Sequence, residues 1–162
     1  MSRPQSKIEE RWNSLTHGSM AILLLLAMPA VLLHFVRQTG KMTVRDTVGV
    51  AIFVLCLILM FATSSIYHGI PATSKYKRIL NRLDHMSIFF AIAGSYTPIV
   101  LSVIGGKIGW IILGVEWSLV LIGVIYKSLS FKKNLLSWIF SIVLYLAMGW
   151  AIVACFPLFA TR

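Results

Sequence analysis

The chain has 162 residues, of which 58% are hydrophobic and 12% are charged, and its mean hydropathy is +0.85. Soluble domains are roughly half apolar and about a quarter charged, so this composition excludes an ordinary soluble domain. The net charge of +10 does not indicate nucleic-acid binding, because the basic residues lie between apolar runs and have no interleaved aromatic face. The sequence therefore predicts an all-α integral membrane protein, a multi-pass bundle of transmembrane helices.

Five apolar segments follow one another in chain order, each about as long as the ~20 residues that cross a bilayer as a helix. Within a single membrane domain covering residues 1–162, they span about 15–36, 47–69, 85–104, 108–126 and 136–159. The turn at 105–107, "GGK", predicts that the third and fourth spans are antiparallel neighbours. In the second connection, residues 77–83 interleave apolar with basic side chains and favour a short surface helix.

The first span is interpreted as a transmembrane helix that stays in the protein. The residues before it carry acidic as well as basic side chains, which is not typical of a cleaved signal peptide. With the N-terminus in the cytoplasm, ten of the 15 Lys and Arg residues fall in inner segments and five in outer ones. The positive-inside rule then predicts a cytoplasmic N-terminus and an external C-terminus.

Polar side chains gather at the predicted cytoplasmic ends of the first three spans. They are Asn13 and His17 in the first span, Ser64 and His68 in the second, and Asp84 and His85 in the third. Ser64 and His68 are four residues apart and share a helix face. Asp84 and His85 point about 100° apart, so only one of them can face the bundle squarely. We expect Asp84 to do so, because a carboxylate at a helix start gains from the helix dipole.

Two interpretations of these histidines remain open. A histidine at a helix end is often a half-hydrated interface residue, which is the simpler explanation for His17 alone and for His34. For His68 the neighbouring Ser64 and Asp84 favour a functional site. Imidazole suits zinc, and a nearby carboxylate can fix a ring tautomer or orient a metal-bound water.

Glu116 lies near the middle of the fourth span, where an acidic side chain is a candidate functional residue. It is either a protonated acid that is hydrogen-bonded inside the bundle or a part of a proton or ion path. Pro98 in "GSYTP" (94–98) predicts a kink in the third span, which Ser95 and Thr97 can compensate locally. The two cysteines, Cys56 and Cys155, are expected to be buried free thiols.

Four segments together resemble the hemolysin III family, which belongs with the progestin and adipoQ receptors and is more distantly similar to alkaline ceramidases. They are "EERWNSLTHG" (9–18), "SSIYHG" (64–69), "LDHMSIFFAIAGSYTP" (83–98) and "YLAMGW" (145–150). The resemblance implies a seven-helix bundle in the plasma (inner) membrane of a bacterium, with a cytoplasmic N-terminus. It also implies a zinc site near the cytoplasmic face.

By this resemblance, a zinc-binding histidine maps onto His68, a serine onto Ser64, and an aspartate that holds the metal-bound water onto Asp84. The family pattern places two more histidines, four residues apart, on the seventh helix. The present sequence has five spans and no H-x-x-x-H, and His17 and His85 are the only substitutes at the right depth. The chain is therefore expected to be a fragment, a frameshifted product or a short form that a partner or oligomer completes.

Three functional hypotheses follow, and the sequence leaves open whether the protein is an enzyme. The first is a zinc-dependent hydrolase that acts on a lipid amide or ester, or a truncated remnant of one, with Asp84 and Ser64 catalytic and His68 a metal ligand. The second is a non-enzymatic protein that forms pores and is cytolytic, or that acts in membrane homeostasis or as a receptor, with Glu116 among its polar lining. The third is a chain without activity of its own.

Overall fold

The computed structural model describes residues 6–38, 44–129 and 135–154, and within these ranges all regular structure is helical. The elements are α1 (Lys7–Gln38), α2 (Val44–Gly69), α3 (Lys77–Ile99), a π-helical turn η1 (Val100–Ile104), α4 (Gly106–Leu129) and α5 (Leu135–Ala154). With η1 counted as the end of α3, five helices are long and apolar enough to cross a membrane. The prediction of an all-α protein with five spans is thereby confirmed.

Two helices, α1 and α3, begin eight residues before the starts expected from the apolar runs. α1 starts at Lys7 because Ser6 and Glu9 form a reciprocal cap, in which Ser6 Oγ accepts the Glu9 N–H and Glu9 Oε2 accepts the Ser6 N–H. Residues 77–83, expected to form a separate surface helix, are instead the first turns of α3. That prediction is wrong because nothing between Lys77 and Pro98 breaks a helix.

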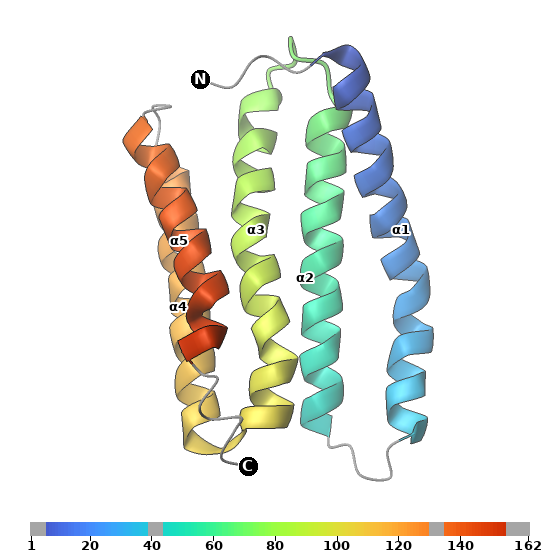
Figure 1. Cartoon of the computed structure of the whole chain (residues 1–162). Coiled ribbons are helices and arrows are strands. Elements are labelled where there is room, and N and C mark those ends of the chain that lie inside the picture. The colour runs from blue at the N-terminus through green and yellow to red at the C-terminus, as the bar shows by residue number, and fades with distance from the viewer. Residues whose placement is uncertain (1–5, 39–43, 130–134, 155–162) are drawn as a thin grey trace.

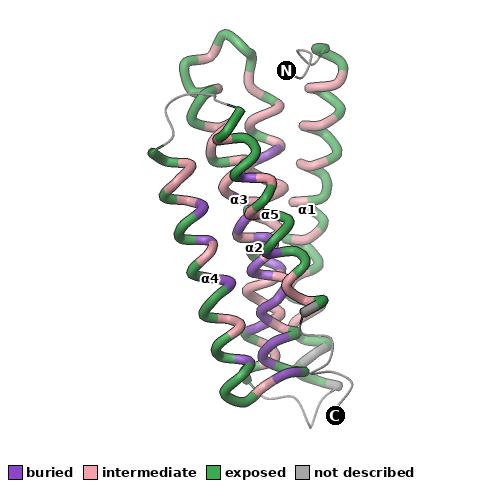
Figure 2. The backbone as a smooth tube through the Cα atoms, turned by 60° about the vertical axis from the view of Figure 1, so that its left-hand side comes forward, coloured by how far each residue is buried: buried purple, intermediate pink, exposed green. Residues whose placement is uncertain are grey.

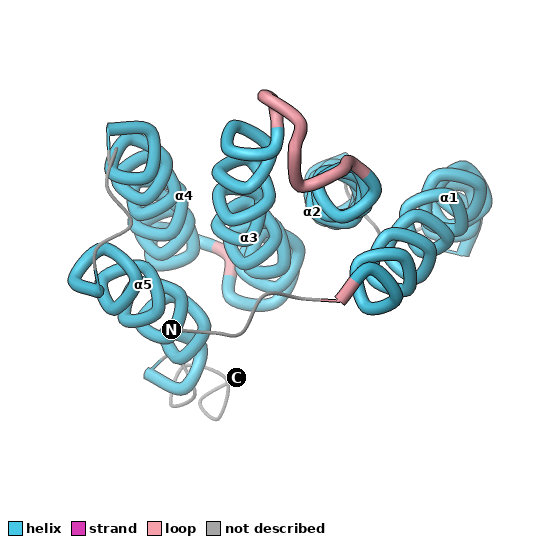
Figure 3. The backbone as a smooth tube through the Cα atoms, turned by 90° about the horizontal axis from the view of Figure 1, so that it is seen from above, coloured by secondary structure: helices cyan, strands magenta, loops and turns pink. Residues whose placement is uncertain are grey.

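α1, α2 and α3 form a row, and α4 and α5 pack against α3 and against each other at the end of that row. α1 packs against α2, α2 against α3, and α3 against both α4 and α5 (Figures 1 and 3). α1 and α3 begin, and α2 ends, at the same end of the bundle, which is at the top of Figure 1. We call this the polar end, because the polar side chains predicted from the sequence lie there.

α3 carries most of the core (Figure 2). Phe89 and Ala93 form one buried cluster with Val120 of α4 and Met148 of α5. A second cluster on α3 contains the buried residues Tyr96, Val100 and Ile104. α1 is the opposite case: none of its most apolar 18-residue window is buried, which suits a helix that faces lipid.

Pro98 lies inside α3, and the helix widens into the π-helical turn η1 directly after it. Ser95 Oγ donates to the Ile92 carbonyl, and Thr97 Oγ1 donates to the Ala93 carbonyl. Neither hydroxyl reaches the Gly94 carbonyl, the acceptor that loses its helical partner at Pro98, so the local compensation expected from the sequence stays a prediction. A proline and a π-turn are both recognised causes of helix distortion.

Tyr96, two residues before this proline, joins α3 to α5. Its hydroxyl donates to the Met148 carbonyl and accepts the Ile152 N–H, each at 2.7 Å. Met148 and Ile152 are the two residues that an uninterrupted α-helix would bond to each other. The tyrosine hydroxyl therefore bridges a carbonyl and an N–H of the α5 backbone that would otherwise bond directly.

Gly94 allows α2 and α3 to approach closely. A Cβ added there would lie 2.7 Å from Cys56 Cβ, an atom that cannot move without the α2 backbone. We predict that Gly94→Ala lowers the free energy of unfolding by about 1–3 kcal/mol, the usual cost of overpacking a tight contact. Thermal unfolding in detergent measures it. Gly114→Ala is the matched control, because a Cβ at Gly114 meets nothing within 4 Å. Equal effects of the two changes would contradict the prediction.

Candidate functional site

The polar end is organised by a close crossing of α1 and α2. Ser14 Oγ donates to the Ser65 carbonyl at 2.9 Å, and Ser65 Oγ donates to the Ser14 carbonyl at 2.8 Å. Two glycines make room for these bonds: a Cβ added at Gly18 would lie 2.8 Å from Ser65 Oγ, and one at Gly69 would lie 3.0 Å from Ser14 Oγ. Small residues four apart on both helices are typical of close packing in membranes.

This crossing brings His17 of α1 against Ser64 of α2. His17 Nδ1 and Ser64 Oγ are hydrogen-bonded at 2.7 Å, and Ser64 is only 6% exposed. The His17 ring also lies edge-on to the His68 ring, with the ring centroids 6.3 Å apart. A candidate that the sequence ranked second, His17, is therefore in direct contact with one of the expected catalytic residues.

His68 is paired with a carboxylate from α1. Its Nδ1–H donates to Glu10 Oε2 at 3.1 Å, and Lys77 Nζ donates to the same oxygen at 3.0 Å. Lys77 Nζ also donates to the carbonyls of Tyr67 and Ile70, which the end of α2 leaves without a helical partner. We refer to Glu10, His17, Ser64, His68 and Lys77 as the polar site.

The other expected residues lie beside the polar site. Asp84 is more buried than His85, with side-chain exposures of 17% and 35%, in line with the expectation that Asp84 faces the bundle. The Asp84 carbonyl accepts from Ser87, which accepts from Thr63, the neighbour of Ser64. Within the described part of the chain, the Asp84 carboxylate has no hydrogen bond to the polar site.

His85 and Asn13 form hydrogen bonds within their own helices. His85 Nδ1–H donates to the Asn81 carbonyl at 2.6 Å. The Asn13 carbonyl accepts from Thr16 Oγ1, and the Asn13 side chain is half-buried. These two candidates are therefore at the polar end but outside the polar site.

The polar site resembles half of a metal site. A metal-binding histidine usually donates one ring N–H to an oxygen, which leaves the other nitrogen for the metal. Nδ1 of His68 and Nδ1 of His17 are both held by oxygens, so Nε2 is the nitrogen left on each ring.

A structural or catalytic zinc site needs at least three protein ligands. No group of three or more His, Cys, Asp or Glu side chains able to hold a metal occurs among residues 6–38, 44–129 and 135–154. The described residues therefore do not fit a complete zinc site.

Glu116 lies far from the polar end, in the middle of α4. It is 1% exposed, and its Oε2 has no hydrogen-bond partner in the described residues. The expectation of a protonated, hydrogen-bonded acid is therefore not met at Oε2, and the alternative of a proton or ion path stays a prediction. Of the two expected free thiols, Cys56 is buried and unpaired, and Cys155 lies outside the described residues.

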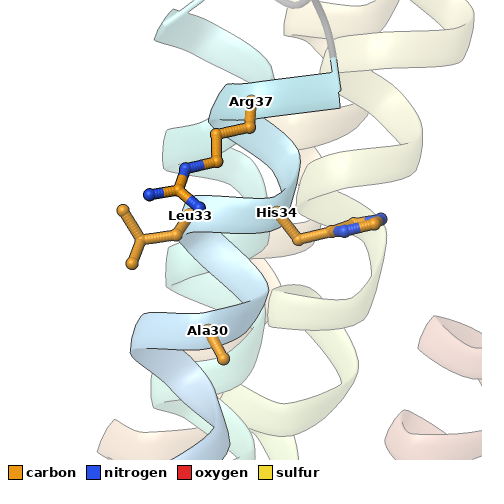
Figure 4. Close-up of a pocket in the computed structure, with 4 residues that line it drawn as sticks. All are labelled: Ala30, Leu33, His34 and Arg37. Carbon is orange, nitrogen blue, oxygen red and sulfur yellow. The ribbon is translucent and has the colours of Figure 1, made fainter.

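His34 lies at the opposite end of α1 from His17. It lines a shallow hollow with Ala30, Leu33 and Arg37 (Figure 4). All four lining residues come from one helix, so among the described residues no second element lines the hollow. The hollow is therefore a feature of the outer surface of α1 and not a candidate active site.

Sequence reasoning missed Glu10 and Lys77, which lay outside the predicted spans. It also missed a repeated pattern: "SLTHG" (14–18) and "SIYHG" (65–69) are both S-x-x-H-G. In the structure the two copies face each other across the crossing, serine against serine and histidine beside histidine. Comparing the chain with itself at this short length would have pointed to the contact.

The chain is similar to known proteins over nearly its whole length. A family model described as haemolysin-III related matches residues 5–161. A protein of Bacillus subtilis (strain 168) named hemolysin-3 homolog is 36% identical over 154 residues, which are 94% of this chain and 69% of the relative. A Bacillus cereus protein named hemolysin-3 is 32% identical over 152 residues, which are 93% of this chain and 66% of the relative. The chain thus spans about two thirds of the length of these curated relatives.

The pairing of Glu10 with His68 is testable by a double-mutant cycle. Glu10→Ala leaves His68 and Lys77 without their shared acceptor, so we expect it to lower the free energy of unfolding by about 1–3 kcal/mol. His68→Ala should cost less in the Glu10→Ala background than in the wild type, with a coupling of about 0.5 kcal/mol or more. Chemical unfolding in detergent measures all four proteins. Strictly additive effects would show that the two side chains do not interact.

Proposed function

We propose that this chain, which belongs to the haemolysin-III-related family, carries a hydrolytic site for a lipid amide or ester at its polar end. The chain is a multi-pass membrane protein, and its named relatives are bacterial. The observation that carries the proposal is the pair formed by His17 Nδ1 and Ser64 Oγ at 2.7 Å. An imidazole in contact with a serine hydroxyl is the arrangement that activates or orients that hydroxyl in acyl transfer.

The position of the site suits a substrate that arrives from the bilayer. Among the described helices α1 packs against α2, and α3 reaches it through Lys77, so we propose that the flank of α1 faces lipid. His17 is half-exposed on that helix, whereas Ser64 behind it is buried. A lipid carbonyl that approaches along α1 would reach the His17–Ser64 pair from the membrane. His68 and Asp84, at the same end, are the groups available to move a proton.

The described residues supply only some of the ligands that a zinc ion would need at this site. His17 and His68 offer two imidazoles with suitably held rings, which is one ligand fewer than a zinc site requires. We propose that any zinc bound here takes its remaining ligand from outside the described residues, either from the same polypeptide or from a partner. A bound zinc ion would supply a Lewis acid and an activated water.

A cytolytic or pore-forming function is the second candidate, favoured by the printed name of the Bacillus cereus relative, hemolysin-3. The described helices support it less well. Their buried polar side chains are few and come from four helices, so they do not form a continuous lining: Ser64, Ser87, Thr97, Glu116 and Ser141.

We predict hydrolysis by membranes that contain this chain. Native membranes are the right preparation, because they retain any partner that completes the site. A lipid amide and a lipid ester with a fluorescent acyl chain report release of the acid. Ser64→Ala and His17→Ala should each reduce the rate about 10²-fold or more, the usual contribution of a positioned acid–base group. His34→Ala is the matched control and should leave the rate unchanged.

Two results would overturn the hydrolytic proposal. One is the absence of hydrolysis in wild-type membranes, and the other is an undiminished rate in both polar-site variants. Zinc measured in protein purified from the same membranes separates the metal question from the catalytic one. A loss of zinc in His68→Ala, but not in His34→Ala, supports ligation by His68.

We further propose that the polar end is cytoplasmic, because ten of the 15 basic residues fall on that side. In a background with Cys56→Ala and Cys155→Ala, Ser74→Cys tests the connection between α2 and α3, and Lys107→Cys tests the start of α4. A membrane-impermeant maleimide should label Lys107→Cys on intact cells and Ser74→Cys only after permeabilisation. The reverse pattern would place the N-terminus outside.

A further inference from the structure

Glu116 is an acid sealed within the part of the chain that spans the membrane. Its residue exposure is 1%, and its Oε2 has no hydrogen-bond partner among the described residues. Two glycines of α4 that lie close to α3 show which residues of α3 stand beside Glu116. A Cβ at Gly123 would meet the Phe89 ring, and one at Gly109 would meet the Val100 carbonyl. This antiparallel register places Glu116 level with residues 93–96 of α3.

The surroundings of Glu116 are apolar on both sides along α4. Val120, one turn later, belongs to the cluster with Phe89, Ala93 and Met148. Ile112, one turn earlier, packs against the cluster that contains Tyr96, Val100 and Ile104. Both clusters also include residues of α5. Glu116 therefore lies between the two groups of contacts that hold α5 to α3 and α4.

No described charge is placed to neutralise this carboxylate. On α4 the charged residues are Lys107 and Lys127, at the two ends of the helix, and Lys127 Nζ donates to Ser141 of α5. On α3 the titratable group at this level is Tyr96, whose hydroxyl is bonded to the α5 backbone. On α5 the titratable group is Tyr145, whose hydroxyl donates to the His85 carbonyl nearer the polar end.

A single buried carboxyl in such a place has few possible ligands. An isolated carboxylate is costly to remove from water, and acids within membrane spans are accordingly paired, protonated or functional. A calcium or magnesium ion needs about six oxygen ligands. The described residues provide no acidic cluster here. A proton is the ligand that one carboxyl can bind alone.

We propose that Glu116 is a proton-binding site, separate from the polar site, and that its proton is required for α5 to stay packed against α3 and α4. Loss of the proton places a charge between the two clusters. Water must then enter to solvate that charge, and α5, which is less buried than α4, separates first. α5 is thereby the element that responds to the occupancy of Glu116.

Infrared spectroscopy of the full chain in detergent tests the bound proton. At neutral pH the wild type should show the carbonyl band of a protonated carboxylic acid, which shifts when the medium is exchanged for deuterium oxide. Glu116→Gln, which keeps the shape of the side chain, should remove that band. Glu9→Gln changes an acid at the polar end and should leave the band in place. Absence of the band from the wild type at neutral pH would overturn the proposal.

The coupling to α5 needs a second measurement. Folding holds a proton at Glu116 that the unfolded chain releases at neutral pH, so stability must fall as the pH rises. We expect the thermal midpoint of the wild type to decrease from neutral to alkaline pH. Over the same pH change, amide hydrogen exchange corrected for its intrinsic rate at each pH should become faster in α5 than in α2. In Glu116→Gln both responses should be lost.

Two outcomes would contradict the coupling. One is an alkaline loss of stability that persists unchanged in Glu116→Gln. The other is faster exchange spread evenly over α2 and α5. Should Glu116→Gln fail to fold, titration of the infrared band in the wild type decides the question: disappearance of the band together with faster exchange in α5 supports the coupling, and a band lost without any change in α5 overturns it.

Discussion

The reciprocal pair of hydrogen bonds between Ser14 and Ser65 is the contact on which the polar end depends. In a bilayer no hydrophobic force draws two apolar helices together, so close packing and polar contacts have to do so. Each serine hydroxyl reaches the backbone of the other helix, which is possible only because Gly18 and Gly69 have no side chain in the way. At that short separation His17 reaches Ser64 and Glu10 reaches His68.

Much of the fold could be predicted from the sequence, because long apolar runs allow little besides membrane-spanning helices. The location of Ser64, His68 and Asp84 at one end also followed from the alternating direction of successive spans. Their partners could not be predicted. Whether His68 meets Asp84 or Glu10 depends on how each helix is rotated about its axis and how far it extends. Glu10 came into reach only because the cap formed by Ser6 and Glu9 starts α1 early.

The two polar regions of the bundle differ in their access to the surroundings. The polar site lies on α1, α2 and the first residue of α3, toward the α1 side of the row and beside a helix end. Glu116 lies on the far side of α3 and is covered by apolar clusters above and below. A site that has to admit a lipid needs the first environment, and a group that has to retain a proton needs the second. The body of α3 lies between the two, and it carries most of the core because α2, α4 and α5 all pack against it.

The Tyr96 hydroxyl has a consequence for how the protein is assembled. α3 enters the membrane before α5 is synthesised, and until then this hydroxyl lacks the α5 carbonyl to which it donates. In a medium of low dielectric a hydrogen bond is electrostatically stronger than in water, so this bond favours the docking of α5 onto α3. In the docked helix the Tyr96 hydroxyl stands between the Met148 carbonyl and the Ile152 N–H of α5. α5, the last described span, thus supplies hydrogen-bond partners for a side chain of α3, which is made two spans earlier.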